Sequence, residues 1–314
     1  MSSTERSIGG DRSGRRHGAG GRRRSRALSR PGGLLPRWRM RPVEEIRHEL
    51  YRIAGQSDAD LAAAALWIAA EEYPNLDPDA YLRYLDDVAA TVERRVAAAP
   101  DPDAARDALS DEMFVQQGFT GNATEYYDPR NSYLNEVIDR RRGIPISLAV
   151  VYLSVGRRLG MPVYGVNAPG HFLVRHGARV LDPFARGRQV APETLLEQLR
   201  QMNVPDPDAH LKRLVAAPPD TRTVLVRMLG NLKANHLQRK DFVRSLAVVD
   251  RLVHLEPTNP LWLRDRGALY QRLECGRAAV ADLERYLELA PDDPESDVLR
   301  ETIVKLTGNA PTLQ

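Results

Sequence analysis

The sequence has one cysteine, few aromatic residues and no long apolar run. Cys275 is the only thiol among 314 residues, which excludes an internal disulfide and a cysteine-rich metal site. No stretch reaches the roughly 18 consecutive apolar residues of a membrane-spanning helix. Hydrophobic residues make up 42% and aromatic residues 6%, so two ordinary domains can each bury an aliphatic core. These features predict a soluble protein of the reducing cytoplasm.

Lysine is absent from the first 41 residues, which hold twelve arginines and only two acids. This segment therefore carries +10, and since the whole chain carries +3, the remainder carries −7. It is rich in glycine and serine and almost free of apolar residues before Leu34, so residues 1–41 are expected to be a disordered tail. A secretion signal is not expected, because the apolar segment of such a signal is absent. The tail could bind nucleic acid, form a solvated extension, or precede a true start at Met40.

Prolines recur in register near the C-terminal end. At an offset of 34 residues, Pro257 aligns with Pro291 and Pro260 with Pro294. Each unit is predicted to be a helix, a turn, a second helix and a proline stop, because proline ends a helix and restricts the residue before it. The pattern resembles tetratricopeptide repeats, whose characteristic positions are occupied by Leu263, Gly267, Tyr270, Gly276, Ala279, Leu287 and Pro291.

The first repeat unit matches less well than the second. His236 stands in place of Tyr270 and Phe242 in place of Gly276, so a distorted turn is predicted there. Two units with a capping helix over residues 295–306 are fewer than the three or so repeats of an independent solenoid. The array is therefore expected to dock, with the acidic body of the same chain as the nearest candidate, although self-association through the repeats would serve equally. The resemblance implies a protein or peptide partner; helical hairpins without a binding role are the alternative.

The central part of the chain is predicted to be helical from residue 42 to about 143, followed by a buried helix that ends at Gly160. Residues 148–155 are apolar except for one serine, which is typical of a helix enclosed on all sides. Pro145 suits the first turn, where a missing amide donor costs little. Ser147 also lies in this turn, where the helix dipole favours developing negative charge.

Short strands are predicted over residues 163–166, 171–175 and 178–182, and the last two form a hairpin across His176-Gly177. In that register His171 faces Asp182, about 4.5–5.5 Å away between Cβ atoms. A carboxylate there could orient the imidazole, as in the base-and-orienter half of a catalytic triad. The alternatives are a partly buried strand histidine and a turn aspartate.

The order Gly-x-x-x-Ser on a buried helix, Pro-Gly-His-Phe-Leu-Val on a strand and then Leu-Asp-Pro-Phe resembles the transglutaminase-like superfamily. With the repeats that follow, residues 43–294 resemble the bacterial SirB-type family. The resemblance implies an α+β fold: a helix-rich, papain-like domain with a small antiparallel sheet over residues 42–215, then an all-α tetratricopeptide-repeat region over residues 219–308. It also implies that His171 and Asp182 match the histidine and aspartate of a Cys-His-Asp triad.

The sequence departs from that superfamily at the nucleophile. Pro145 stands where the superfamily has cysteine, so ordinary transglutaminase or cysteine-protease chemistry is not expected. Ser147 is the nearby replacement, although two positions along a helix rotate it by about 200°. Alternatively, this serine satisfies backbone donors at the helix end. Residues predicted to line the pocket are Pro145, Asn135, Glu136, Asn167 and Arg175.

Three functions follow from these observations. The first is a noncatalytic protein-interaction protein with a degenerate transglutaminase-like domain and a repeat-based partner surface. The second is a serine-dependent hydrolase or acyltransferase that uses Ser147, His171 and Asp182. The third is nucleic-acid binding through the arginine-rich tail, which ranks last because the body is acidic. No cofactor or metal is expected, because His171 and His176 would point to opposite strand faces and no phosphate loop occurs.

Overall fold

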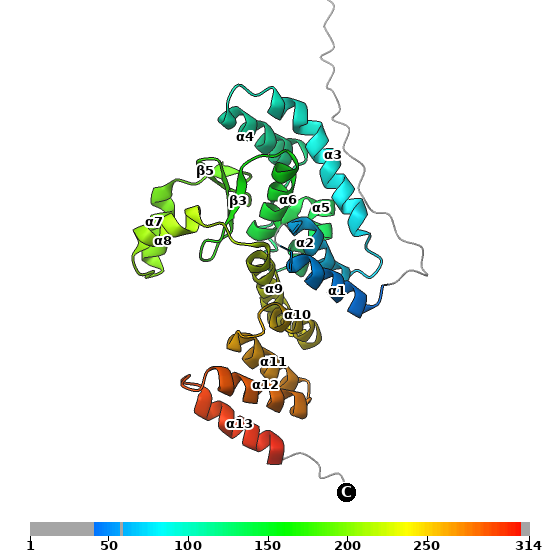
Figure 1. Ribbon diagram of the computed structural model, residues 1–314, viewed down its shortest axis with the longest axis vertical. Coiled ribbons are helices and arrows are strands. Elements are labelled where there is room, and N and C mark those ends of the chain that lie inside the picture. The colour runs from blue at the N-terminus through cyan, green and yellow to red at the C-terminus, as the bar shows by residue number, and fades with distance from the viewer. Residues whose placement is uncertain (1–40, 57–58, 309–314) are drawn as a thin grey trace, which may run out of the picture.

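A computed structural model describes residues 41–56 and 59–308, and in it helices surround a small sheet (Figure 1). The first half contains α1 (Val43–Ala54), α2 (Leu61–Ala70), α3 (Pro78–Ala97), α4 (Pro102–Asp111), the π-helix η1 (Glu112–Gln116), the 3-10 helix η2 (Pro129–Asn131), α5 (Leu134–Arg140) and α6 (Pro145–Arg158). The strands are β1 (Thr120–Gly121), β2 (Arg142–Gly143), β3 (Val163–Val166), β4 (Leu173–His176), β5 (Arg179–Asp182) and β6 (Arg188–Gln189). After the sheet come α7 (Pro192–Gln201), α8 (Pro207–Ala216), α9 (Thr221–Gln238), α10 (Phe242–Leu255), α11 (Pro260–Arg272), α12 (Gly276–Leu289) and α13 (Ser296–Gly308).

α2 is the centre of the helical half. Its start is capped by Asp60, whose carboxylate accepts hydrogen bonds from the amides of Ala62 at 2.8 Å and Ala63 at 3.1 Å. Every residue of α2 is buried, because α1, α3, α5 and α6 enclose it. α3 has a one-sided pattern, with a buried stripe made of Tyr81, Tyr84, Leu85, Val88 and Val92. α3 therefore covers the core with one face, whereas α2 is buried on all sides.

α6 crosses the middle of the domain, as predicted. Pro145 is at its first turn, and the residues from there to Gly156 are buried. A Cβ atom on Gly156 would lie 2.8 Å from Cγ2 of Val163, so this glycine lets β3 pack closely on the helix. Gly160, with φ of 67°, takes the left-handed conformation just beyond the helix end.

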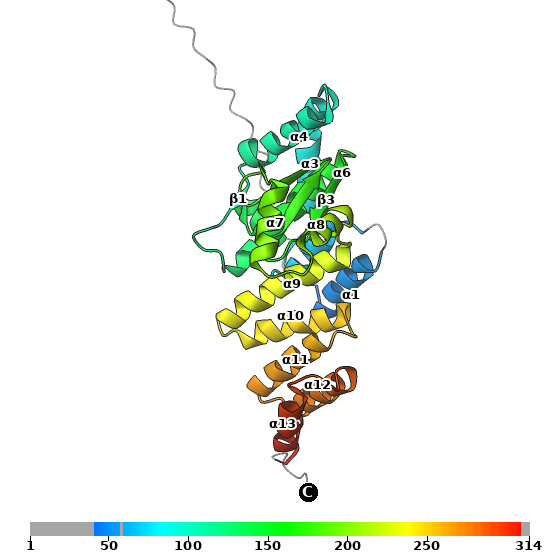
Figure 2. The same ribbon diagram turned by 90° about the vertical axis from the view of Figure 1, so that its left-hand side faces the viewer.

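The main sheet has the order β3-β4-β5-β6, and each neighbouring pair is antiparallel. α6 packs on one face of it. α7 and α8 lie over the other face (Figure 2), where Leu195 of α7 packs in a small apolar cluster with Val166, Leu173 and Val180. β1 and β2 form a separate two-stranded parallel sheet. The small antiparallel sheet of the predicted fold is therefore confirmed.

The predicted register of the β4–β5 hairpin is wrong by two residues. β4 and β5 pair Val174 with Leu181, so the loop between them is residues 177–178 instead of 176–177. Gly177 supplies the left-handed backbone that the turn needs, with φ of 59°. Because side chains alternate with a period of two, an even shift leaves each predicted residue on its predicted face.

The buried side chain of His176 explains why β4 continues to residue 176. This imidazole is only 4% exposed, and its Nδ1 lies 2.9 Å from the hydroxyl oxygen of Tyr152 on α6. Burial lowers the pKa of His176 to about 4, so the ring is neutral at pH 7. A neutral imidazole packed in the core belongs to the strand, and the turn begins one residue later.

The C-terminal region consists of helical hairpins, as the proline spacing predicts. Lys240 and Glu274, 34 residues apart, both take left-handed backbone conformations in the inter-helix turns, with φ of 58° and 60°. The predicted distortion of the first turn is therefore wrong. Phe242 and Gly276 are the first helical residues after their turns, where any residue fits, so the first unit does not need glycine.

The first hairpin is docked on the central domain, as predicted. Its buried residues Val224, Leu225, Met228, Leu229 and Leu232 belong to the same apolar cluster as α1, α2 and α6. Polar contacts close the edge: Arg47 binds Asp250 at 2.7 Å, and Arg251 donates to the carbonyl oxygen of Ile68 at 3.2 Å. The apolar core thus continues beyond the expected domain limit at residue 215.

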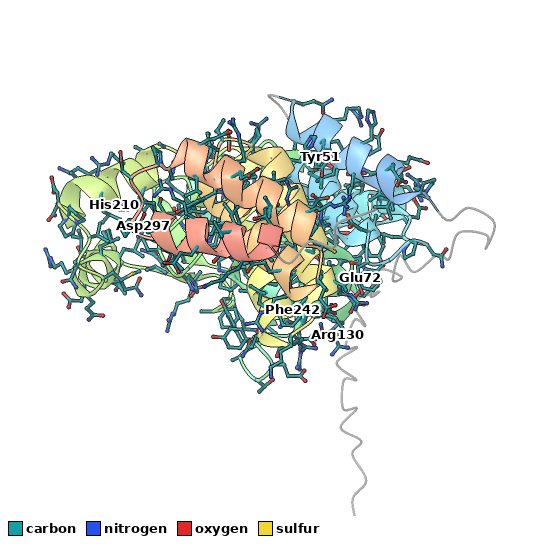
Figure 3. The ribbon with its side chains drawn as sticks, turned by 90° about the horizontal axis from the view of Figure 1, so that it is seen from below. Tyr51, Glu72, Arg130, His210, Phe242 and Asp297 are labelled. Carbon is teal, nitrogen blue, oxygen red and sulfur yellow. The ribbon has the colours of Figure 1, made fainter. Side chains whose placement is uncertain are left out.

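The first hairpin, α9 and α10, docks on the side of the central domain that α1 and α2 form. Figure 3, seen from below, places Tyr51 and Glu72 on this side and His210 of α8 on the opposite side. The ring of Tyr51 stacks on that of His254 with centroids 3.5 Å apart, and Arg244 binds Glu72 at 2.8 Å. α11, α12 and α13 continue away from the domain toward the C-terminus (Figure 1).

Three remaining expectations concern the N-terminal tail, membrane-spanning helices and the capping helix. The predicted disordered tail lies outside the described residues, except for Arg41, whose guanidinium carbon lies 4.8 Å from the ring centroid of Trp67. Within the described ranges, no helix has both the length and the apolar composition that a membrane span requires. The predicted capping helix is present as α13.

Candidate functional site

His171 and Asp182 form a hydrogen-bonded pair at the end of the sheet. Nε2 of His171 lies 2.9 Å from Oδ1 of Asp182. His171 follows a turn at Gly170, which has φ of 70°, and Asp182 is the last residue of β5. Because the observed register differs by two residues from the predicted one, His171 and Asp182 are diagonal neighbours on one face of the sheet instead of directly opposite. Long side chains can still meet at this spacing. The contact predicted between them is present.

The carboxylate of Asp182 is held through its Oδ1 atom. Besides the imidazole, Oδ1 accepts hydrogen bonds from the amides of Phe184 at 2.9 Å and Ala185 at 3.3 Å. Burial alone would raise the pKa of Asp182, but the hydrogen bond and charge of His171, with these two amides, outweigh it and hold that pKa below its ordinary value. Asp182 is therefore ionised at neutral pH and can orient the imidazole.

A pocket of about 420 Å³ lies beside this pair, between the sheet and α7. It is lined by Pro169, Gly170, His171, Leu173, Asp182, Arg188, Val190, Thr194, Leu195, Gln198, Gln201 and Met202. Its volume falls within the usual range of ligand sites. The α7 and β6 residues of this lining were missed in the sequence, because nothing in residues 188–202 shows which part of the sheet α7 covers.

Ser147 is not at this site. Its side chain is fully buried at 0% exposure, and its hydroxyl donates to the carbonyl oxygen of Asn131 at 2.6 Å. The hydroxyl oxygen of Ser147 also accepts a hydrogen bond from the amide of Ile144 at 3.1 Å. Within the described part of the chain no hydrogen bond joins Ser147 to His171. The serine thus ties the start of α6 to the neighbouring loop.

The other candidate nucleophiles are no nearer. Pro145 is buried at the start of α6 and has no nucleophilic atom. Cys275 is exposed in the turn between α11 and α12, in the repeats (Figure 1). Thr194 carries the only hydroxyl in the pocket lining, and within the described residues no hydrogen bond joins it to His171. The pair can hold or move a proton, but no attacking atom is in bonding contact with it.

Asn135 and Glu136, predicted to line the pocket, lie elsewhere on α5. Asn135 is only 5% exposed, and its Oδ1 has no hydrogen-bond partner among the described residues. Glu136 lies beside Tyr73, where burial and this carboxylate together raise the pKa of the phenol. Neither residue lines the pocket, because α5 packs against α2 and α6, away from α7.

Asn167 and Arg175 also lie outside the pocket lining. Asn167 accepts a hydrogen bond from Arg227 of α9, which also donates to the carbonyl oxygen of Ala168 at 2.8 Å. Arg175 lies over the ring of Tyr164, with its guanidinium carbon 4.3 Å from the ring centroid. The predicted lining is therefore not that of this pocket: Asn167 ties the adjacent loop to the first repeat, and Arg175 packs on β3.

Metal-binding side chains do not gather in the described residues. No group of three or more histidine, cysteine, aspartate or glutamate side chains lies close enough to hold an ion there. The ring of His176 lies in the core beside Tyr152, whereas the imidazole of His171 is partly exposed.

Two family profiles match consecutive parts of the chain. A profile of the transglutaminase-like superfamily matches residues 79–230, and a tetratricopeptide-repeat profile matches residues 232–303. The first match extends into α9, in agreement with the core shared by this helix and the domain. Together they confirm the predicted fold class and the order of its two parts.

Relatives with the same organisation occur in bacteria. A UPF0162 protein of Xylella fastidiosa (strain 9a5c) is 42% identical over 259 residues, which cover 79% of this chain and 90% of the relative. Protein SirB1 of Salmonella typhimurium is 28% identical over 196 residues, covering 61% and 72%. Among solved structures, menin is similar over 86% of this chain and 78% of its own, with 13% identity and a TM-score of 0.38, too low to support an argument about fold.

Proposed function

We propose, from the premise that this chain belongs to the UPF0162 family that includes SirB1, that it is a cytoplasmic protein-interaction protein. In this proposal the transglutaminase-like domain holds a peptide segment of the partner without cleaving or cross-linking it. The repeats supply a second contact surface. An anion-binding role for the arginine-rich residues 1–41 stays a separate prediction, since residues 1–40 lie outside the described part.

One observation carries the proposal: an oriented His171–Asp182 pair borders an open pocket, and no nucleophilic atom of the described residues is hydrogen-bonded to the imidazole. A cysteine-dependent acyl transfer needs a thiolate within hydrogen-bond reach of the imidazole. Cys275 is in the repeats, and the cysteine position of the superfamily is Pro145. What the site retains is a pocket and a polar pair that can bind the amides of a peptide.

The serine-dependent alternative has a specific obstacle. Ser147 would have to break its hydrogen bonds to Asn131 and Ile144 and leave a fully buried position before it could attack a substrate. Labelling by a fluorophosphonate probe, compared between wild type and the variants Ser147→Ala and Thr194→Ala, tests any hydroxyl-based mechanism. Wild-type labelling that either variant abolishes would establish an enzyme.

Site-specific photocrosslinking tests the interaction proposal in the full chain. Benzoylphenylalanine is placed at Met202 on the pocket rim, which is 53% exposed, and at Leu261 on α11, which is 46% exposed. Val115, which is 67% exposed and lies outside the pocket and the repeats, is the matched control position. We expect Met202 and Leu261 to cross-link the same polypeptide in living cells, and Val115 not to.

The outcomes separate the two surfaces. Cross-links at Leu261 alone would mean that the domain pocket takes no part in recognition. Equal patterns at all three positions would mean nonspecific contact and would refute the proposal. Recovery of the same partner after His171→Gln would show that binding does not require the imidazole to act as a base.

A further inference from the structure

We infer that the pocket beside His171 recognises an acidic peptide segment, in which a carboxylate side chain binds Arg188 and a neighbouring apolar side chain packs against α7. This inference rests on the proposed interaction function and specifies the chemistry of the partner. It is carried by the charges, the shape and the apolar lining of the pocket.

The charge available to a ligand in the pocket is positive. Arg188 lines the pocket, and no ion pair among the described residues includes it. It is paired in register with Asp182 across β5 and β6, yet the carboxylate of Asp182 already accepts from His171, Phe184 and Ala185. The only acidic side chain of the lining is therefore bound through its Oδ1 atom to groups of this chain, whereas the only arginine has no ion pair among the described residues and remains available for a carboxylate.

The wall formed by α7 is suited to an extended chain. Thr194 and Met202 stand at the two ends of the lining, which at 1.5 Å per residue makes the wall about 12 Å long. Three or four extended residues, at about 3.3 Å each, cover this length. Gln198 and Gln201, one turn apart on the same helix, offer amide groups to a peptide backbone. Gln201 also donates to Glu197, at 3.2 Å, so this acid on α7 is engaged too.

The apolar part of the pocket continues beneath α7. Leu195, Met202 and Pro169 line both the pocket and a narrow crevice between α7 and α8, which Leu211 and Leu214 close. α8 itself has no buried residue, and α7 buries only Leu195 and Leu199. In the inferred complex an apolar side chain of the peptide packs against Leu195 and Met202 at the mouth of this crevice, whose own volume of about 10 Å³ is too small to hold it.

A peptide-retention assay with the full chain tests the inference. Immobilised protein is equilibrated with pools of acetylated pentapeptides that have Glu, Gln or Lys fixed at the centre and random residues elsewhere, and the retained peptide is quantified. For wild type, we expect about tenfold more retention of the Glu pool than of the Lys pool, the ratio that one charge pair with an affinity effect of about 1.4 kcal/mol produces. Arg188→Glu should reverse this order.

The matched control is Arg186→Glu. Arg186 is exposed in the turn before β6 and outside the pocket lining, so this variant should keep the wild-type order of retention. A reversed preference in Arg188→Glu cannot arise from misfolding, because a misfolded pocket would lose retention of every pool without gaining the Lys pool.

The remaining outcomes overturn the inference in distinguishable ways. Equal retention of the three pools by wild type would remove the charge specificity but leave peptide binding, and with it the proposed function, intact. Displacement of the Glu pool by free glutarate at millimolar concentration would make this a small-molecule carboxylate site. Retention of no pool would refute both this inference and peptide binding by the central domain, while cross-linking through the repeats would still be open to measurement.

Discussion

Replacing Ser147 by alanine separates a structural serine from a catalytic one. In the structure the hydroxyl of Ser147 joins two backbone groups at the start of α6, the carbonyl of Asn131 at 2.6 Å and the amide of Ile144 at 3.1 Å. The variant removes this oxygen and leaves both groups in a site without solvent. We therefore expect a large loss of stability, independent of any activity.

The size of the loss follows from these two groups. A buried polar group left without a partner costs about 1–3 kcal/mol. The amide of Ile144 keeps a long contact of 3.4 Å to the carbonyl of Asn131, so the two groups partly satisfy each other. Ser147→Ala should therefore lower the free energy of unfolding by about 2–4 kcal/mol.

Urea unfolding of the full chain measures this difference. We expect a lower midpoint at an unchanged slope, because the substitution does not alter the surface exposed on unfolding. Ser154→Ala on the same helix is the matched control. Its hydroxyl donates at 2.7 Å to the carbonyl of Val150, which keeps its backbone helix bond in the variant, so the loss should stay below about 1 kcal/mol.

The reasoning would be refuted if Ser147→Ala were as stable as Ser154→Ala. Loss of fluorophosphonate labelling in Ser147→Ala alone, without loss of stability, would identify an accessible, reactive hydroxyl. Unchanged labelling together with the expected destabilisation would leave Ser147 with a purely structural role.

Two further predictions concern titration and packing. Because burial holds the pKa of His176 at about 4 in the folded state against 6.5 ordinarily, the unfolded chain binds a proton first, and the free energy of unfolding should fall by up to about 3 kcal/mol as the pH drops from 6.5 to 4. His176→Phe should lose this part of the pH dependence in urea titrations; equal slopes for both proteins would contradict the assignment. Gly267→Ala places a Cβ atom 2.9 Å from Cδ2 of Leu283, so we expect a net loss of about 1 kcal/mol from overpacking. Gly230→Ala, which meets nothing within 4 Å, should instead stabilise the chain by up to about 1 kcal/mol, and thermal unfolding shifts of the same sign in both variants would refute the packing argument.

Local patterns in the sequence were sufficient for the helices and the repeats. The paired prolines at Pro257 and Pro291 end α10 and α12 because proline cannot continue a helix, whatever surrounds it. The apolar stretch after Pro145 predicts a buried helix because no face of it can remain in water. The predicted contact of His171 with Asp182 tolerated a register error of two residues, since an even shift preserves the face of a strand.

The tertiary structure alone decided what depends on contacts between distant segments. The register of the hairpin follows from His176, whose ring contacts Tyr152 of α6 in the core. Neither segment by itself predicts this contact. The pocket exists because α7 lies over the sheet beside Arg188, and its lining combines residues of a loop, of the strands and of α7. The role of Ser147 likewise depends on the loop that supplies the carbonyl of Asn131. Propensity acts over neighbouring residues, whereas a site is made by packing, and packing is settled only when the whole core forms.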